Sequence, residues 1–440
     1  MAEDLAEALA GGPVVHTSSW TRLKAILGGS AGNLVEWYDW FAYASFTIYF
    51  AKVFFPHGDQ TAQLMPAAAV FAIGFLARPA GAWLMGLYAD RKGRRSALAL
   101  SVALMCFGSL MVAVTPGYAQ IGQAAPVLLT LARVIQGLSV GGEYGASATY
   151  MSEMAGRARR GFWSSFQFVT IIAGQLTALG VLIVLQHTLS AHALDAWGWR
   201  IPFVIGALLA VVVFAIQLGL EESASFTAGQ GQGVDRAGTM MLFLKHPRET
   251  AIIFALTSAG SLAFYAFTTY MQKFLTNTAH FSKSQATDIT AWSLVWYMFA
   301  QPAFGWLGDK VGRRTLLAAS FGLLTLATFP ILATLAVQGR ALVAFGLIAA
   351  ALTLLSGYTA VNAVVKAELF PTNVRALGVA LPYALANAVF GGTAEYAALW
   401  FKQQKIELGF YVYVSVVCLV ACITALRMRD TQRHSLILED

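Results

Sequence analysis

Ionisable side chains stand inside long apolar stretches of this sequence, and they are the residues best placed to do chemistry. The stretch 24–51 carries Asn33, Glu36 and Asp39, which an α-helix would hold within an arc of about 120° on one face. Two carboxylates one turn apart in an apolar setting favour protonation of each other, as a group that binds and releases protons requires. We predict that Glu36 or Asp39 handles protons. The alternative is that one of them only pairs with Arg78 and holds the helices together.

A second polar stripe lies in the stretch 126–151, where Arg133, Gln136 and Glu143 fall within about 80° of a helix. A charge buried in an apolar helix is costly and usually marks a functional pathway. We predict that Arg133 and Gln136 contact an anionic substrate or a coupling acid, and that Glu143 takes part in proton coupling. Arg78 is a further such charge, predicted either to contact the substrate or to pair with an acid.

The later part of the chain supplies donors rather than acids. Polar residues recur at helical spacing in three apolar stretches, 249–276, 341–369 and 376–400. The side chains predicted to contact the substrate are Tyr265, Gln272, Lys273, Asn362, Lys366 and Asn387. The alternative for such stripes is that they only hold helices together, and for the two lysines that they extend toward the membrane surfaces.

The composition excludes a water-soluble protein. Hydrophobic residues make up 58 % of the chain and charged residues only 12 %, whereas a soluble domain carries about 25 % charged residues. Unbroken apolar stretches of about twenty residues recur, as membrane-spanning helices require and barrel strands do not. We therefore predict an all-α integral membrane protein. The net charge of +7 does not indicate a nucleic-acid partner, because the basic residues gather in loops on one side of the membrane.

Twelve apolar segments fall into two groups of six. They are 24–51, 64–88, 96–116, 126–151, 162–187, 200–220, 249–276, 287–308, 315–337, 341–369, 376–400 and 409–427. The predicted division is an N-terminal tail 1–22, a first half 23–220, a linker 221–248, a second half 249–427 and a C-terminal tail 428–440. Most basic residues outside the segments then lie on the side of the two termini, which predicts that both termini are cytoplasmic.

A ten-residue motif occurs twice and relates the two halves. Gly86–Arg95 (GLYADRKGRR) and Gly305–Arg314 (GWLGDKVGRR) both read G-x-x-x-D-[R/K]-x-G-R-R. The glycines permit close backbone approach, and the aspartates can accept hydrogen bonds from arginines and helix N-termini. The predicted conformational lock comprises Gly86, Asp90, Arg91, Gly93, Arg94, Gly305, Asp309, Gly312 and Arg313. The alternative is that these loops only anchor positive charge on the inner side.

Two six-helix halves with this duplicated loop resemble the major facilitator superfamily of secondary transporters. GNLVEWYDW, RVIQGLSVGGEYG and ALANAVFGGTAEY are similar to its metabolite:H⁺ symporter branch, which carries 2-oxoglutarate, citrate, shikimate, proline and betaine. TTYMQKFL and KAELFPTNVRALG, which contain Lys273 and Lys366, resemble the α-ketoglutarate carriers of that branch most. The likeness covers nearly the whole chain apart from the first 20 residues and the linker. It implies twelve transmembrane helices in two pseudo-symmetric halves.

The resemblance implies a proton-coupled symporter that takes up α-ketoglutarate or a similar di- or tricarboxylate across the bacterial inner membrane by alternating access. A dianion entering against about 100 mV, negative inside, is opposed by about 4.6 kcal/mol, which co-transported protons offset. The sequence contains no phosphate-binding loop, nucleophile elbow or metal cluster, so no enzyme activity, cofactor or metal is expected. The expected partners are a small carboxylate, protons and the lipid bilayer, and the working expectation is a monomer.

Three alternatives stay open. A proline or betaine carrier of the same branch would not need Lys273, and a citrate or shikimate carrier would differ only in the detail of its pocket. A membrane receptor or channel belongs to another class of protein. It would not be expected to show two similar halves with duplicated loops.

Overall fold

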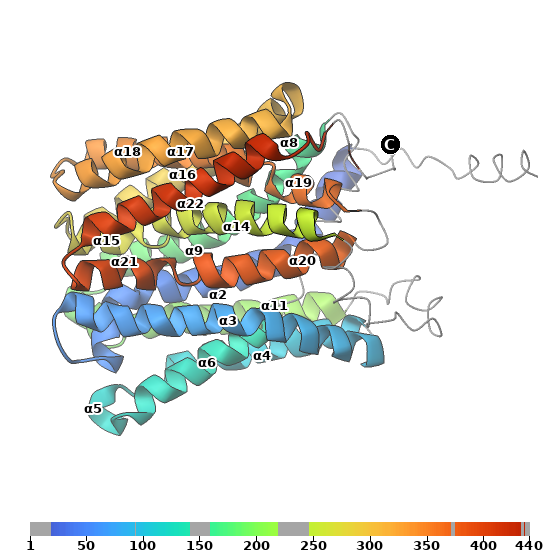
Figure 1. Ribbon diagram of the computed structural model, residues 1–440. Helices are drawn as coiled ribbons and strands as arrows, with labels where there is room; N and C mark the ends of the chain where they lie inside the picture. The colour runs from blue at the N-terminus through green and yellow to red at the C-terminus, as the bar shows by residue number, and fades with distance from the viewer. Residues whose placement is uncertain are drawn as a thin grey trace, which may run out of the picture.

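Helices account for every regular element in the part of the chain that the structure describes. The computed structural model describes residues 19–92, 94–140, 159–218, 246–370, 375–432 and 435, and no strand occurs among them. A helix satisfies its own backbone hydrogen-bonding groups, which a chain surrounded by lipid requires. Figure 1 shows the helices lying side by side with roughly parallel axes.

The helices before residue 219 are called the N-terminal set, and those after residue 245 the C-terminal set. The N-terminal set contains α2 (Ser19–Phe54), α3 (Gln60–Lys92), α4 (Arg94–Val114), α5 (Tyr118–Ile121), α6 (Ala124–Val140), α8 (Arg160–Ser164), α9 (Phe166–Thr188), α10 (Ala191–Ala196), η2 (Gly198–Arg200) and α11 (Ile201–Leu218). The C-terminal set contains α14 (Pro247–Phe267), α15 (Met271–Asn277), α16 (Lys283–Val311), α17 (Arg313–Ala336), α18 (Ala341–Thr359), α19 (Asn362–Glu368), α20 (Arg375–Ala386), η3 (Asn387–Gly391), α21 (Ala394–Gln403) and α22 (Glu407–Arg427). Where the structure describes them, all of the predicted apolar segments coincide with one of these helices or with consecutive ones.

The predicted tails and linker lie largely outside the described residues. Neither 1–18 nor 219–245 is described. α2 begins at Ser19 and α14 at Pro247, so helix extends a few residues into the predicted tail and linker. The division of the chain into two halves therefore stays a prediction at its boundaries.

Six stretches of the described residues are long and apolar enough to cross a membrane. They are Gln60–Met85, Arg160–Thr188, Pro247–Phe267, Arg313–Ala336, Ala341–Glu368 and Glu407–Arg427. Their mean hydropathy lies between 1.5 and 2.3. Three shorter apolar helical stretches are Ala99–Val114, Ala124–Ser139 and Gly198–Val212. Length and composition thus fit a protein that crosses the membrane several times.

Apolar side chains cover the outside of the bundle as well as filling its interior. Large apolar residues face outward, and Phe299, Leu326 and Leu342 are 71 %, 75 % and 80 % exposed. Arg133 and Lys273, in contrast, are 0 % exposed. A surface in contact with lipid must be apolar, whereas a charge inside a membrane protein needs partners and usually marks a functional site. The buried charges therefore indicate where to look for the site.

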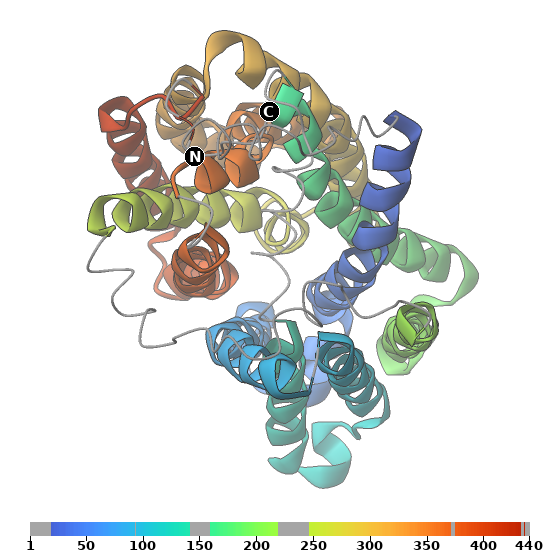
Figure 2. The same ribbon diagram turned by 90° about the vertical axis from the view of Figure 1, so that its right-hand side faces the viewer.

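The two sets meet along two seams. In one, α8 and α9 pack against α16; in the other, α3 packs against α20, η3 and α21. Figure 2 views the molecule from the end where α8 and α19 lie and shows the two sets on opposite sides. We call this the α8 end of the bundle, and the opposite end, where α15 lies (Figure 1), the α15 end.

Three segments of the C-terminal set are interrupted partway along their length. One break separates α14 from α15, a second separates α18 from α19, and the π-helix η3 separates α20 from α21. Glycine permits the close approach of η3 to α3, because a Cβ on Gly392 would lie only 2.5 Å from the Cβ of Phe75. Irregular backbone at membrane depth is tolerated where it is buried in protein or lines a cavity. The three interruptions therefore point to a cavity beside them.

Candidate functional site

Asp39 of α2 lies at the centre of a buried polar cluster and is 1 % exposed. Its Oδ2 accepts a hydrogen bond from Gln136 Nε2 of α6 at 2.6 Å, and its Oδ1 accepts one from Ser109 Oγ of α4. Arg133 Nη1 lies 3.6 Å from Asp39 Oδ2 and donates to Gln136 Oε1 at 2.7 Å. Donors from two helices thus surround one carboxylate, and three of the predicted site residues, Asp39, Arg133 and Gln136, come together.

Two buried guanidinium groups share the ring of Trp40. The Cζ of Arg133 lies 3.9 Å from the centre of that ring and 4.5 Å from the centre of Tyr43. The Cζ of Arg78, on α3, lies 4.2 Å from the centre of Trp40 and 4.0 Å from the centre of Phe75. Contact with aromatic faces stabilises a cation that has lost its water. Aromatic rings of α2 and α3 therefore contact the guanidinium groups of both arginines.

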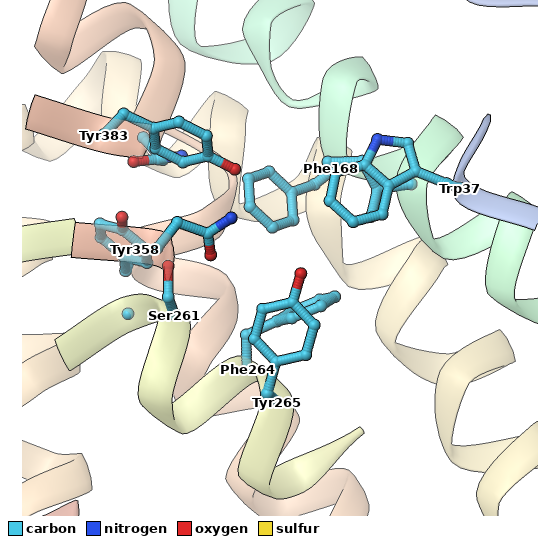
Figure 3. A pocket seen from close by; sticks show the side chains of 11 residues that line it. Trp37, Phe168, Ser261, Phe264, Tyr265, Tyr358 and Tyr383 are labelled. Carbon is cyan, nitrogen blue, oxygen red and sulfur yellow. The ribbon is translucent and has the colours of Figure 1, made fainter. Parts of the chain in front are cut away.

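A small cavity lies between the two sets. Its lining residues are Trp37, Phe168 and Ile171 from the N-terminal set and Gly260, Ser261, Phe264, Tyr265, Tyr358, Asn362, Tyr383 and Asn387 from the C-terminal set. Figure 3 shows Trp37 and Phe168 on one side, Tyr358 and Tyr383 on the other, and the Tyr265 hydroxyl pointing into the space. Mostly apolar walls with a few polar groups are typical of a small-molecule site.

Arg78 and Lys366 approach this cavity from opposite sets. The Cζ of Arg78 lies 4.9 Å from the centre of Trp37, and its charge interacts with Tyr265 and Tyr383. The Nζ of Lys366, on α19, lies 4.2 Å from the centre of Tyr383. Because Trp37, Tyr265 and Tyr383 all line the cavity, an anionic ligand there would have one cation from each set within reach.

A buried ion pair joins α15 to α21. The Nζ of Lys273 lies 2.9 Å from Glu395 Oε2 and 3.5 Å from the backbone oxygen of Thr269. The side chains of Lys273 and Glu395 are 0 % and 4 % exposed. Residue spacing predicts Lys273 as a substrate contact and no role for Glu395. The break before α15 and the π-helix before α21 decide that these two residues meet, and neither is visible in the residue spacing.

Gln272 does not line the cavity, although its spacing from Tyr265 predicted one shared helix face. Its Nε2 donates instead to Thr287 Oγ1 of α16 at 3.0 Å. The break between α14 and α15 lies between Tyr265 and Gln272, so the two side chains do not share a helix face. Glu36 is 7 % exposed, and its charge interacts with that of Arg78. The alternative in which an acid of α2 is the partner of Arg78 therefore fits Glu36, while Asp39 lies beside Arg133.

Several predicted residues cannot be placed. Glu143 and Gly93 lie outside the described residues. For Gly86, Asp90, Arg91 and Arg94 the structure describes helical backbone only. The first copy of the repeated motif thus stays a prediction.

Asp309 of the second copy lies against the first turn of α8. Its Oδ1 accepts a hydrogen bond from Gly161 N at 2.8 Å, and its Oδ2 accepts one from Phe162 N at 2.9 Å. Arg313 contributes Nη2 at 3.2 Å from Asp309 Oδ1 and Nε at 3.1 Å from Glu368 Oε2. Asp309 and Arg313 belong to the C-terminal set and α8 to the N-terminal set, so this copy of the motif joins the two sets.

The backbones of the two sets also touch at the α8 end. A Cβ on Gly305 would lie 2.6 Å from the backbone oxygen of Gly161. Val364 N donates to Ser164 Oγ at 3.1 Å, which links α19 to α8. Gly312 has a φ of +90°, which favours glycine at the corner between α16 and α17. The glycines of the motif thus provide close approach at one position and a tight turn at the other.

At the α15 end, Asp195 of α10 bridges the two sets. Its Oδ2 lies 2.7 Å from Lys52 Nζ of α2, and its Oδ1 lies 3.2 Å from Lys283 Nζ of α16. Burial alone would raise the pKa of Asp195, but its hydrogen bonds with Lys52 and Lys283 and their positive charges outweigh burial and hold the pKa below its usual value. Asn277 Nδ2 donates to Thr61 Oγ1 at 3.0 Å across the other seam. Described residues therefore link the two sets at both ends, with the cavity between.

Aromatic residues supply much of the site, and sequence reasoning did not single them out. The residues concerned are Trp37, Trp40, Phe168, Phe264 and Tyr383. For the two tryptophans a signal existed, since they stand directly beside Glu36 and Asp39 in GNLVEWYDW. Phe168 and Phe264 lie in ordinary apolar segments and give no such signal. Among the described residues, no group of three or more His, Cys, Asp or Glu could hold a metal ion.

Comparison with known proteins identifies similar transporters. A family model described as "Sugar (and other) transporter" matches residues 25–247 and 235–438. The chain is 49 % identical to the alpha-ketoglutarate permease of Escherichia coli (strain K12), over 94 % of this chain and 95 % of that protein. It is 32 % identical to a citrate-proton symporter of Klebsiella pneumoniae, over 92 % of both chains. With a proline/betaine transporter of Salmonella typhimurium the identity is 30 %, over 94 % of this chain and 84 % of that protein.

Solved structures agree in fold. The major facilitator superfamily proton:xylose symporter XylE superposes with a TM-score of 0.75 at 18 % identity, over 94 % of this chain and 97 % of that one. A partially occluded inward-open form of XylE from E. coli gives a TM-score of 0.73 at 18 % identity, over 90 % of this chain and 95 % of that one. The predicted fold class and the resemblance to this superfamily are confirmed.

Proposed function

The chain belongs to the sugar (and other) transporter family of the major facilitator superfamily, and we propose that it is a proton-coupled symporter of α-ketoglutarate or a similar di- or tricarboxylate. The observation that carries the proposal is the approach of two buried cations, Arg78 and Lys366, to one cavity from opposite sets. A dicarboxylate offers one negative group to each. The 49 % identity to an alpha-ketoglutarate permease supports this choice of substrate over an osmolyte.

Substrate binding uses both sets of helices at once. One carboxylate lies at Arg78 and the other at Lys366, while the carbon chain lies against Trp37 and the other aromatic walls. Tyr265, Asn387 and Asn362, which line the cavity, offer donors to the remaining oxygens. A ligand held by both sets draws them together, and this drives the change between the two open forms of an alternating-access carrier.

Proton binding takes place at Asp39. In the described state its carboxylate accepts from Gln136 and Ser109 and lies beside Arg133. A proton on Asp39 removes the negative charge next to Arg133, whose positive field then extends through Trp40 toward Arg78 and the substrate. Proton binding thus favours anion binding, and the two leave together when the opposite side opens. Glu36, beside Arg78, is the second proton-site candidate of α2, and Glu143 stays a candidate from the sequence alone.

Alternating access requires links that break at one end while those at the other end hold. We assign this role to Asp309, Arg313 and Gly305 at the α8 end and to Asp195 at the α15 end. The α8 end faces the cytoplasm, as do both termini, because the positive loops of the repeated motif lie on that side. The protein resides in the bacterial inner membrane and works as a monomer on a carboxylate and protons.

Competition in proteoliposomes tests the proposal. The purified protein is reconstituted, and uptake of labelled α-ketoglutarate is measured under an inward proton gradient with and without excess citrate, succinate, shikimate or betaine. We expect accumulation above the outside concentration that a protonophore abolishes, with strong competition by dicarboxylates and none by betaine. Competition by citrate alone, or by betaine alone, would reassign the substrate. Equilibration without accumulation would instead indicate a channel.

A further inference from the structure

The Lys273–Glu395 pair lies off the cavity, toward the α15 end. Lys273 is eight residues beyond Tyr265, and Glu395 is eight residues beyond Asn387. Tyr265 and Asn387 both line the cavity. A break in the helix lies between the two residues of each pair, and α15 and α21 both lie beyond it, at the α15 end (Figure 1). The ion pair therefore lies nearer than the cavity to that end.

Glu395 faces the seam between the two sets. α21, which carries Glu395, packs against α3 of the N-terminal set. The charge of Glu395 interacts with Tyr43 of α2 and with Tyr270 of α15. Alternating access requires the α15 end to open, and opening along this seam would separate α2 and α3 from α21. Lys273 then becomes the first buried cation that an anion meets on its way to the cavity.

We propose that Lys273 binds a carboxylate group of the substrate on the entrance route, and we call this site the entrance station. Glu395 is the ion-pair partner of Lys273 until a substrate carboxylate displaces it. The inference rests on the proposed function, since it requires an anionic substrate. The exchange replaces one carboxylate by another at the same ammonium group, so the charge balance at Lys273 does not change. The substrate then moves on to Arg78 and Lys366, and Glu395 returns.

The surroundings suit such an exchange. Apart from Glu395, Lys273 has the backbone oxygen of Thr269 to hold it in position. Tyr43 and Tyr270 lie within electrostatic reach of Glu395, and the Tyr43 hydroxyl donates to the backbone oxygen of Ala67 at 2.9 Å. Tyr270 in turn interacts with Glu407, at the start of α22. On α3, the charged side chain that the structure describes is that of Arg78, which faces Tyr265 and Tyr383 instead.

Three variants test the inference: Lys273→Gln, Glu395→Gln and the double variant. For each, the half-saturation concentration and the maximal rate of α-ketoglutarate uptake are measured. Lys273→Gln should raise the half-saturation concentration about tenfold or more, the loss of one charge-assisted hydrogen bond, with the maximal rate little changed. Glu395→Gln should lower the half-saturation concentration and also lower the maximal rate. Without Glu395 to take its place at Lys273, the substrate carboxylate leaves the station more slowly. The double variant should behave like Lys273→Gln.

A purely structural ion pair would give another pattern. Removing either partner would impair folding and uptake alike, and the double variant, which has no unpaired charge, would recover toward wild type. That recovery would overturn the inference. Ligand-dependent thermal stabilisation of each purified variant provides a second readout if uptake is lost: tighter α-ketoglutarate binding by Glu395→Gln supports the station, and weaker binding contradicts it.

The pair Lys402–Glu407 is the matched control. Its Nζ and Oε2 lie 3.6 Å apart at the same end, with side chains 19 % and 23 % exposed. Lys402→Gln should leave both kinetic constants near the wild-type values. If the wild-type protein neither binds nor takes up α-ketoglutarate, the proposed function fails and the inference with it. Wild-type uptake without the expected variant pattern contradicts the inference alone.

Discussion

The two sets of helices hold their buried acids in different ways. Asp39 in the N-terminal set accepts from Gln136 and Ser109 and has Arg133 3.6 Å away. Glu395 in the C-terminal set has one cation, Lys273, at 2.9 Å. A carboxylate surrounded by several donors is released by a proton, which cancels its charge. A carboxylate with a single cationic partner can be released by another carboxylate. We therefore propose that the N-terminal set couples protons and that the C-terminal set exchanges carboxylates.

The largest expected effect is that of Asp39→Asn. The amide carries no charge and takes up no proton, so uptake driven by a pH gradient should fall about 100-fold, the consequence of losing a buried charge with several partners. Exchange of labelled for unlabelled substrate without a gradient should persist. The same substitution at the exposed Asp59 is the control. If Asp39→Asn still accumulates substrate, the assignment of proton coupling to the N-terminal set is wrong.

The next effect separates the two arginines that share Trp40. Arg133→Lys keeps the charge but loses the planar group that bonds Gln136 and lies on Trp40, so we expect a loss of about tenfold in gradient-driven uptake. Arg78→Lys keeps a cation beside the cavity and should mainly raise the half-saturation concentration, by about threefold. Initial rates over a range of substrate concentrations measure both. Equal effects of the two substitutions on every constant would remove the distinction between them.

Gly305→Ala tests the α8 end with a smaller expected effect. The added methyl group would lie 2.6 Å from the backbone oxygen of Gly161, so the two sets cannot close fully there. We expect uptake to fall roughly threefold. A cysteine introduced by Ser164→Cys should react faster with an impermeant maleimide in the Gly305→Ala variant than in the protein with Gly305. The labelling of the three native cysteines is subtracted as background. Gly346→Ala, with nothing within 4 Å, is the control. If Gly305→Ala leaves the labelling rate unchanged, the contact of Gly305 with Gly161 plays no part in closing the α8 end.

The smallest effect is expected at the α15 end, where Asp195→Asn removes a link between partly exposed side chains. Opening at this end should become at most about threefold faster, and the difference should shrink at high salt. Because the pKa of Asp195 is lowered in the closed state, the link is present above the usual carboxyl pKa and is lost as the pH falls through the lowered value. The link should therefore contribute no pH dependence between about pH 5 and pH 8. A salt-insensitive, pH-dependent effect in that range would contradict this account.

Residue spacing predicted more of the N-terminal site than of the C-terminal one. Arg133 and Gln136 lie on one unbroken helix, so their common face could be read from the sequence, as could the inward face of α2. The contact of Asp39 with Gln136 could not be read from the sequence. It depends on how α2 packs against α6, because the two residues are 97 positions apart in the chain. In the C-terminal set, uninterrupted helical spacing misplaced Gln272, since a break precedes α15. The contact of Lys273 with Glu395 depends on that break and on the π-helix η3 together.

The central claim is that Asp39 carries a proton with the substrate, and proton movement tests it most directly. Proteoliposomes with a trapped pH indicator and no imposed gradient receive α-ketoglutarate from outside. The lumen of wild-type vesicles should become acidic as substrate enters, whereas Asp39→Asn vesicles loaded with unlabelled substrate should exchange it for labelled substrate without acidification. Equal acidification in both, or substrate entry into wild-type vesicles with no proton movement, would contradict it.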